Sequence, residues 1–189
     1  MKKRIVAALA ASLALMTLAS TAGATITITQ APGGQPSPGY YKNLSPWTLT
    51  PGTACGGNGG TYASTDRIRL GFGWLASNRA GVREFFLDTH GYVQITGSDT
   101  FNDTWARSGT PFVTTQGIKW TVEDGLPGVT PGGAPITGSA AFYRGVLSLA
   151  PGQYTLSVGM LVDKTFTDGW ETYTAGTSSL SNTCTFTVS

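Results

Sequence analysis

His90 is the residue on which most nucleophilic catalysis in this chain would depend, because the sequence contains one histidine. A Ser-His-Asp triad would use its ring as the base, with Asp88, two positions earlier, as the acid that orients it. No serine lies in a G-x-S-x-G turn. A histidine near the tip of a hairpin is most simply a solvated turn residue, so we expect no triad.

Two carboxylates could instead serve a secreted glycosidase. The pairs close in sequence are Glu84 with Asp88 and Glu123 with Asp124. Ten acidic residues produce such pairs by chance. We therefore expect a protein that is not an enzyme, and a secreted hydrolase is kept only as an alternative.

A third acidic group, Asp163, Asp168 and Glu171, lies in the segment "DKTFTDGWE". Calcium is held by several oxygen atoms of this kind, often from a loop. The spacing is not that of an EF-hand, and solvated side chains explain it equally well. These three residues are weak calcium candidates, and we expect no metal or other cofactor.

Aromatic residues outside regular alternation are the stronger candidates for binding. They are Trp170, Trp105, Trp47, Tyr173 and Tyr41, in or beside "TDGWETY", "FNDTWAR", "NLSPWTL" and "GYYKN". Aromatic rings on loops suit stacking on the flat faces of a ligand or anchoring of a protein partner. They could equally be buried where long loops fold over the sandwich. Trp170 is the best single candidate, because it follows an Asp-Gly turn signal.

The elements that would position these residues are strands. Alternating apolar residues predict strands at residues 25–30, "TITITQ", and in "RIRLGFGWL" and "IKWTVE". Trp74 and Trp120 alternate in step with their aliphatic neighbours and therefore lie on the same strand face, so we expect both in the core.

Other segments are predicted to be turns or irregular structure. Residues 31–60 and 126–138 are rich in glycine and proline and read as loops, and residues 89–91 read as a hairpin between two strands. No window beyond the first 24 residues shows sustained helical periodicity.

The clearest local signal is "LSLAPGQYTLSV", in which Pro151 and Gly152 make a turn and Tyr154 restarts the alternation. This pattern resembles the tyrosine corner of immunoglobulin-like or fibronectin type III-like sandwiches. The resemblance implies an all-β, immunoglobulin-like β-sandwich of about seven to nine antiparallel strands, with long Gly/Pro-rich loops. It also implies a buried Tyr154 whose hydroxyl bonds near the turn. Leu156 stands where antibody domains have a cysteine. A jelly roll or another kind of β-sandwich is kept as an alternative.

The two cysteines, Cys55 and Cys184, are expected to form a disulfide, because an even count in an exported chain usually pairs. The bridge would join a Gly-rich loop to the last strand.

The first 24 residues have the pattern of a signal peptide: a basic start, an apolar stretch and Ala22-Gly23-Ala24 before the cut. They carry three of the twelve basic residues and none of the ten acidic ones, which leaves nine against ten. Residues 25–189 suit a single β-sandwich domain. We expect it to be secreted or periplasmic, without nucleic-acid partners and without a membrane after cleavage.

The sequence as a whole favours a secreted binding protein whose ligand is an extracellular carbohydrate or surface protein, held by aromatic-bearing loops. One alternative is a structural or adhesive subunit, in which the N-terminal strand leaves its own sandwich and completes a neighbour's. The other is the secreted hydrolase. The oligomeric state is not predicted.

Overall fold

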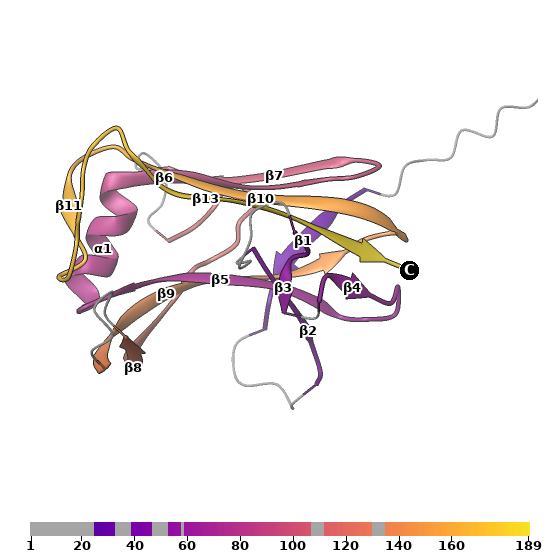
Figure 1. Ribbon diagram of the computed structural model, residues 1–189, viewed down its shortest axis with the longest axis horizontal. Helices are drawn as coiled ribbons and strands as arrows, with labels where there is room; N and C mark the ends of the chain where they lie inside the picture. Colours follow the sequence, from indigo (N-terminus) through magenta and orange to yellow (C-terminus); the bar gives the residue numbers. More distant parts are fainter. Residues whose placement is uncertain (1–24, 33–38, 47–52, 58, 107–111, 130–134) are drawn as a thin grey trace, which may run out of the picture.

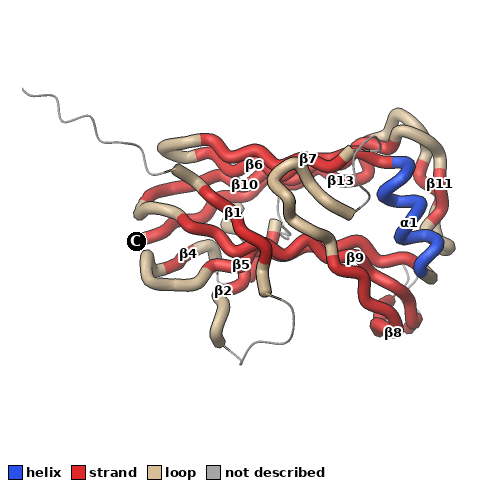
Figure 2. Tube along the Cα trace, turned by 180° about the vertical axis from the view of Figure 1, so that it is seen from behind, coloured by secondary structure: helices blue, strands red, loops and turns tan. Residues whose placement is uncertain are grey.

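The described part of the chain folds as a sandwich of two β-sheets, with one helix at the end opposite the C-terminus (Figures 1 and 2). The structure is a computed structural model, and it describes residues 25–32, 39–46, 53–57, 59–106, 112–129 and 135–189. The expected signal peptide, residues 1–24, lies outside this range, and so does Trp47.

Sheet A contains β1 (Thr27–Gln30), β2 (Lys42–Ser45), β3 (Gly56–Gly57), β5 (Ile68–Ala76), β8 (Thr121–Val129) and β9 (Pro135–Ser148). Its order is β1-β9-β5-β2-β3, with β8 also paired to β9. Sheet B contains β4 (Thr61–Tyr62), β6 (Thr89–Thr96), β7 (Thr100–Trp105), β10 (Gly152–Val162) and β13 (Ser178–Val188), in the order β4-β13-β10-β6-β7. A separate ribbon pairs β11 (Phe166–Thr167) with β12 (Thr172–Tyr173).

Both sheets are mixed, which corrects the prediction of seven to nine antiparallel strands. β2 runs parallel to β5, and β4 runs parallel to β13. β2 and β3 come from residues 31–60, which we predicted to be irregular, and β4 follows directly after them. Strands of two to four residues are too short to show alternation, so the sequence pattern does not reveal them.

The longer strands follow the predicted alternation. Ile68, Leu70 and Phe72 of β5 point into the core, and Trp74 is half-buried against it. In β10, Tyr154, Leu156, Val158, Met160 and Val162 are all buried. Ile26 and Ile28 are buried as well, and β1 pairs with β9 of its own chain. The strand-exchange alternative would have to break this pairing, and it stays a prediction.

The helix α1 (Arg79–Asp88) replaces the hairpin that we predicted around residues 89–91. The Asn78 side chain caps it by accepting hydrogen bonds from the backbone N–H groups of Ala80 and Gly81. Val82, Phe85 and Phe86 form one buried face that packs into the end of the sandwich. Because the helix has only ten residues, its buried face covers too few turns to show a clear helical period, and the segment resembles a strand.

The predicted loop at residues 126–138 is also corrected, since most of it belongs to an antiparallel pair of strands. β8 and β9 pair from Thr121 opposite Phe142 to Val129 opposite Pro135, with an irregularity between Glu123 and Leu126. Pro127 is exposed in β8, at the side of the sheet where a missing N–H is tolerated.

Aromatic rings fill the core next to α1. Trp120 is buried and lies within ring-contact distance of Phe72, Phe86 and Trp105, at centroid distances of 5.1–5.4 Å. Trp74 stacks on Phe85 at 4.8 Å. The predicted core position of Trp120 is thus confirmed. The prediction holds in part for Trp74, which is half-buried.

A buried carboxylate joins the two sheets within this core. Asp103 of β7 accepts hydrogen bonds from the hydroxyls of Tyr143 (2.9 Å), Thr114 (2.7 Å) and Thr115 (3.1 Å) and from the Gln116 N–H (2.9 Å). Tyr143 comes from β9, on the opposite sheet. Burial raises the pKa of Tyr143, and the neighbouring carboxylate raises it further, so this phenol stays a donor.

The predicted tyrosine corner is present. Tyr154 is buried, and its hydroxyl donates a 2.7 Å hydrogen bond to the carbonyl oxygen of Ala150, at the start of the turn that Pro151 and Gly152 complete. The chain crosses from sheet A to sheet B at this point, so the bond fixes the angle between β9 and β10.

Tyr154→Phe is expected to lower the free energy of unfolding by about 1 kcal/mol, because it removes one hydrogen bond and keeps the ring. Urea unfolding followed by fluorescence measures the change. Tyr92→Phe, which alters an exposed tyrosine of β6, is the matched control and should leave stability unchanged. An equal effect of the two substitutions would show that the corner contributes nothing.

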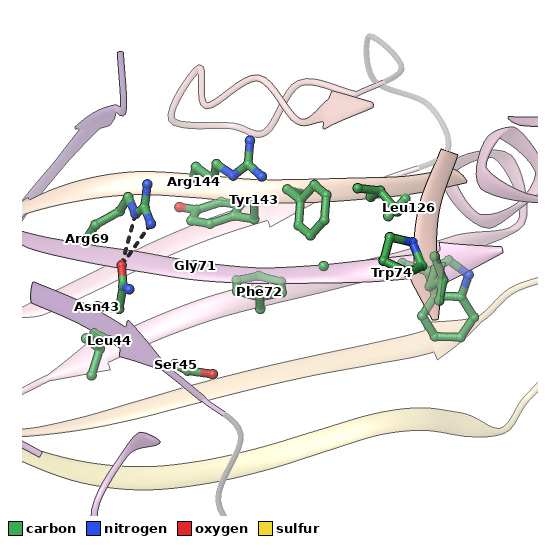
Figure 3. Close-up of a pocket in the computed structure, with 15 residues that line it drawn as sticks. Asn43, Leu44, Ser45, Arg69, Gly71, Phe72, Trp74, Leu126, Tyr143 and Arg144 are labelled. Carbon is green, nitrogen blue, oxygen red and sulfur yellow. Dashed lines mark hydrogen bonds between the residues drawn. The ribbon is translucent and has the colours of Figure 1, made fainter. Parts of the chain in front are cut away.

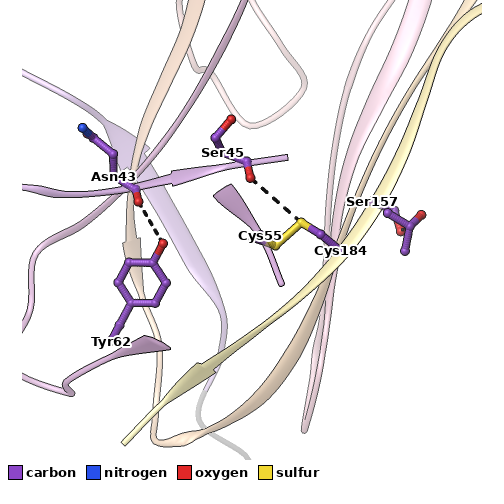
Figure 4. Close-up of a disulfide and its surroundings, with 7 residues drawn as sticks. Asn43, Ser45, Cys55, Tyr62, Ser157 and Cys184 are labelled. Carbon is purple, nitrogen blue, oxygen red and sulfur yellow. Dashed lines mark hydrogen bonds between the residues drawn. A yellow bond between two sulfur atoms is a disulfide. The ribbon is translucent and has the colours of Figure 1, made fainter. Parts of the chain in front are cut away.

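The predicted disulfide is confirmed: Cys55 and Cys184 are bonded, with a Cα–Cα distance of 4.9 Å (Figure 4). Cys184 lies in β13 of sheet B, and Cys55 directly precedes β3 of sheet A. Backbone hydrogen bonds from Cys55 N to Thr185 O and from Thr185 N to Thr53 O flank the bridge. The bridge therefore ties the Gly-rich segment and the edge of sheet A to the last strand.

Candidate functional site

The aromatic residues predicted for binding do not gather in one place. Trp105 is buried in the core at the end of β7, so its expected position on a loop is corrected. It points inward because Phe101 and Asp103 share its parity. Trp170 is half-buried, and its ring lies beside Gly138 of β9. Trp47 lies outside the described residues.

Tyr173 is half-buried in β12, where its ring packs against neighbouring aromatic rings and does not project into solvent. Its ring stacks on Phe166 at 5.0 Å and contacts Trp74 edge-on at 4.9 Å. Its hydroxyl donates to Asp168 Oδ2 at 3.0 Å, and burial together with that carboxylate raises its pKa. Of the predicted set, Tyr41 alone lies near a groove, as described below.

The three weak calcium candidates have separate partners. Asp168 is buried, and its Oδ1 accepts hydrogen bonds from the N–H groups of Trp170 and Glu171, which holds the β11–β12 turn. Asp163 contacts His90 instead. Within the described ranges, no three His, Cys, Asp or Glu side chains form a group that could hold a metal ion.

The catalytic candidates are arranged differently from the prediction. His90 Nδ1 lies 2.7 Å from Asp163 Oδ1, so Asp163, and not Asp88, is its acidic partner. Asp88 and Glu84 both belong to α1 and line a hollow of about 620 Å³ that Lys164 also lines. The other pair separates: Glu123 binds Arg144, and Asp124 binds Arg79. Hydrogen bonds from Ser139 and Arg79 lower the pKa of Asp124.

A groove of about 700 Å³ lies on the outer face of sheet A, away from the core (Figure 3). Its floor is the middle of β5, where Gly71 and Gly73 face outward because Leu70 and Phe72 face inward. The outward-facing residues that line it are Asn43, Ser45, Arg69, Gly71, Gly73, Leu75, Leu126, Pro127, Ala140, Phe142 and Arg144.

The two floor glycines have different surroundings. A Cβ atom at Gly73 would lie 2.6 Å from the Phe142 ring, so this ring covers Gly73 from the neighbouring strand. A Cβ atom at Gly71 would meet only the carbonyl oxygen of Tyr143, at 3.9 Å. Gly71 is thus the open point of the floor, and a side chain there would enter the groove.

One end of the groove carries a fixed guanidinium group. Arg69 donates from Nε and Nη2 to the side-chain oxygen of Asn43, at 3.2 and 2.9 Å. The Tyr41 ring lies 5.4 Å from the same guanidinium carbon. β2 brings Asn43 beside Arg69 through its parallel pairing with β5.

A second arginine borders the floor. Arg144 lies opposite Gly71 in β9, and its guanidinium carbon is 4.3 Å from the centroid of the Phe142 ring. It also forms an ion pair with Glu123. The groove therefore combines an apolar floor with planar polar groups held in place at one end, which suits a ligand with an apolar face and a polar edge.

The groove on β5 is not among the sites predicted from the sequence, although Arg69, Gly71 and Gly73 alternate with the buried residues of the strand. The arginine-glycine alternation "RIRLGFG" is the signal that could have suggested it, because glycine on an exposed strand face leaves a hollow.

Comparisons with models of protein families, with curated proteins and with solved structures found no match to this chain. In the part of the chain that the structure describes, no helix is long and apolar enough to span a membrane. The disulfide is typical of an oxidising compartment outside the cytoplasm.

Proposed function

We propose that the chain is exported and acts as a non-catalytic binding protein, with a carbohydrate bound in the groove on the outer face of sheet A. The observation that carries this proposal is the bare floor at Gly71 between the Arg69–Asn43 pair and the Phe142 ring. The signal-like N-terminus and the disulfide support export.

A sugar fits this groove better than a purely apolar ligand does. A pyranose ring has an apolar face, which can lie on Gly71 and against Phe142, and a rim of hydroxyls, which can bond to Arg69 and Asn43. Side chains that are already held by hydrogen bonds lose little conformational entropy when they bind. The site thus moves from the loop aromatics of the sequence-based prediction to the exposed face of a sheet.

Gly71→Val is expected to abolish detectable glycan binding or to weaken it more than about tenfold, because the new side chain occupies the floor. Stability should stay equal or rise slightly, since valine is favoured in strands and a Cβ atom at this position meets no close neighbour. A glycan array of the mature protein, followed by calorimetry with a glycan that binds, measures the effect.

Thr185→Val is the matched control for this experiment. It adds an apolar side chain to an exposed position of β13, on sheet B, and should leave binding unchanged. Wild-type affinity in the Gly71→Val protein would overturn the proposed site.

We also infer that the sandwich is immunoglobulin-like. The Tyr154 bond to Ala150 supports it. The pairing of β5 with β9 in one sheet, and of β10 with β6 and β13 in the other, supports it as well, because strands B and E, and strands C, F and G, pair in this way in such domains. Under this assignment α1 lies in the B–C connection.

A further inference from the structure

The arginines on the outer face of sheet A differ in how their charge is compensated. Arg144 forms an ion pair with Glu123, and Arg79, at the start of α1, forms one with Asp124. Arg69 instead donates two hydrogen bonds to the neutral amide oxygen of Asn43. Its position is therefore fixed while its positive charge is not neutralised.

Arg67, directly before β5, also carries a charge without an acidic partner. Its guanidinium carbon lies 4.3 Å from the centroid of the Tyr40 ring, and among the described residues no carboxylate lies within 4 Å of its charged nitrogens or those of Arg69. Aromatic rings hold a guanidinium group in place without removing its charge. Two arginines without an acidic partner thus lie two residues apart, and of these Arg69 lines the groove.

One edge of the Arg69 guanidinium group has no partner among the described residues. Nε and one N–H of Nη2 bond to Asn43, whereas the second N–H of Nη2 and the N–H groups of Nη1 have no hydrogen-bond acceptor in the described part of the protein. A guanidinium group binds a carboxylate through two parallel N–H donors, and such charge-assisted bonds are about twice as strong as neutral ones.

We propose that the groove selects acidic glycans, with the carboxylate of a uronic acid bound at Arg69 and the sugar ring lying over Gly71. This inference rests on the proposed function and adds the chemical class of the ligand. Arg67 adds attraction at the rim, and the Arg144–Glu123 pair, which is already neutral, contributes shape through its contact with Phe142.

Calorimetry with trigalacturonate and with its fully methyl-esterified form tests this proposal, because the two probes share one backbone and differ in charge. The mature protein should bind trigalacturonate at least about tenfold more tightly than the ester, the factor expected for a hydrogen bond to a charged group. Arg69→Gln should remove that preference, and Arg69→Lys should keep only part of it, since lysine lacks the paired donors. Arg83→Gln, at an exposed position of α1, is the matched control and should change nothing.

Equal affinity for the acid and the ester would overturn the inference while the proposed function stands. Failure of both probes and of neutral oligosaccharides to bind in the groove would overturn both. Equally tight binding of single-stranded DNA, with the same dependence on Arg69, would show that the groove recognises charge alone, and this too would contradict the inference.

Discussion

Replacing both Cys55 and Cys184 with alanine is expected to lower the free energy of unfolding by about 5 kcal/mol, the value that the chain-entropy account of disulfides gives for a loop of this length. The two residues are 129 positions apart, so the bridge closes most of residues 25–189 into one loop. A single domain of this size is stable by only about 5–15 kcal/mol. The loss is therefore large enough to shift the urea midpoint strongly.

Wild-type protein that has been reduced with a thiol reagent is the control, and it should unfold at the midpoint of the double variant. Mass spectrometry without reduction should find no free thiol in the untreated protein. Two free thiols, or an intermolecular bridge, would contradict the pairing. An unchanged midpoint in the double variant would show that the bridge does not stabilise the fold.

Asp103→Ala is expected to cost about 3–5 kcal/mol, the range for removing one partner of a buried charged network. Asp103 is fully buried, and its carboxylate is the acceptor for three hydroxyls and one backbone N–H. The substitution leaves these donors in the core without an acceptor. Urea unfolding at neutral pH measures the change.

Tyr143→Phe separates this network from simple packing. Alone, it should cost about 1 kcal/mol, because it removes one hydrogen bond and leaves the ring stacked on Phe72. In the Asp103→Ala protein it should cost almost nothing, since the phenol has already lost its acceptor. Strictly additive effects in this double-mutant cycle would contradict the network.

Local patterns account for the parts of the fold that the sequence predicts. The alternation in β5 and β10 fixes which residues are buried, because each long strand has one face on the core. The turn before Tyr154 and the disulfide can also be predicted without knowledge of distant contacts. The turn follows from the local Pro-Gly pattern, and the disulfide follows from the single pair of cysteines.

Two segments differ from the prediction for local reasons. "FNDTW" is too polar to predict a strand, although Trp105 lies on the same face of β7 as Phe101 and Asp103. The sequence around α1 resembles a strand because it combines Gly81 with two adjacent phenylalanines. Gly81 is there for close approach, since a Cβ atom would lie 3.1 Å from the Asp168 carbonyl oxygen.

The groove could not be predicted because cross-strand register creates it. Arg69 meets Asn43 through a parallel pairing with a four-residue strand, and Gly71 meets Arg144 from a strand more than 70 positions later. No local pattern encodes these pairings. The sequence shows only that arginine and glycine share one face of β5.

The most direct test of the proposed binding groove is a titration of ¹⁵N-labelled mature protein with trigalacturonate, followed through its amide chemical shifts. The account predicts progressive shifts at Asn43, Arg69 and Gly71, with no change at Thr185 on sheet B. Shifts centred on Trp170 in the β11–β12 ribbon, with the amides of β5 unchanged, would contradict it and return the site to the loops.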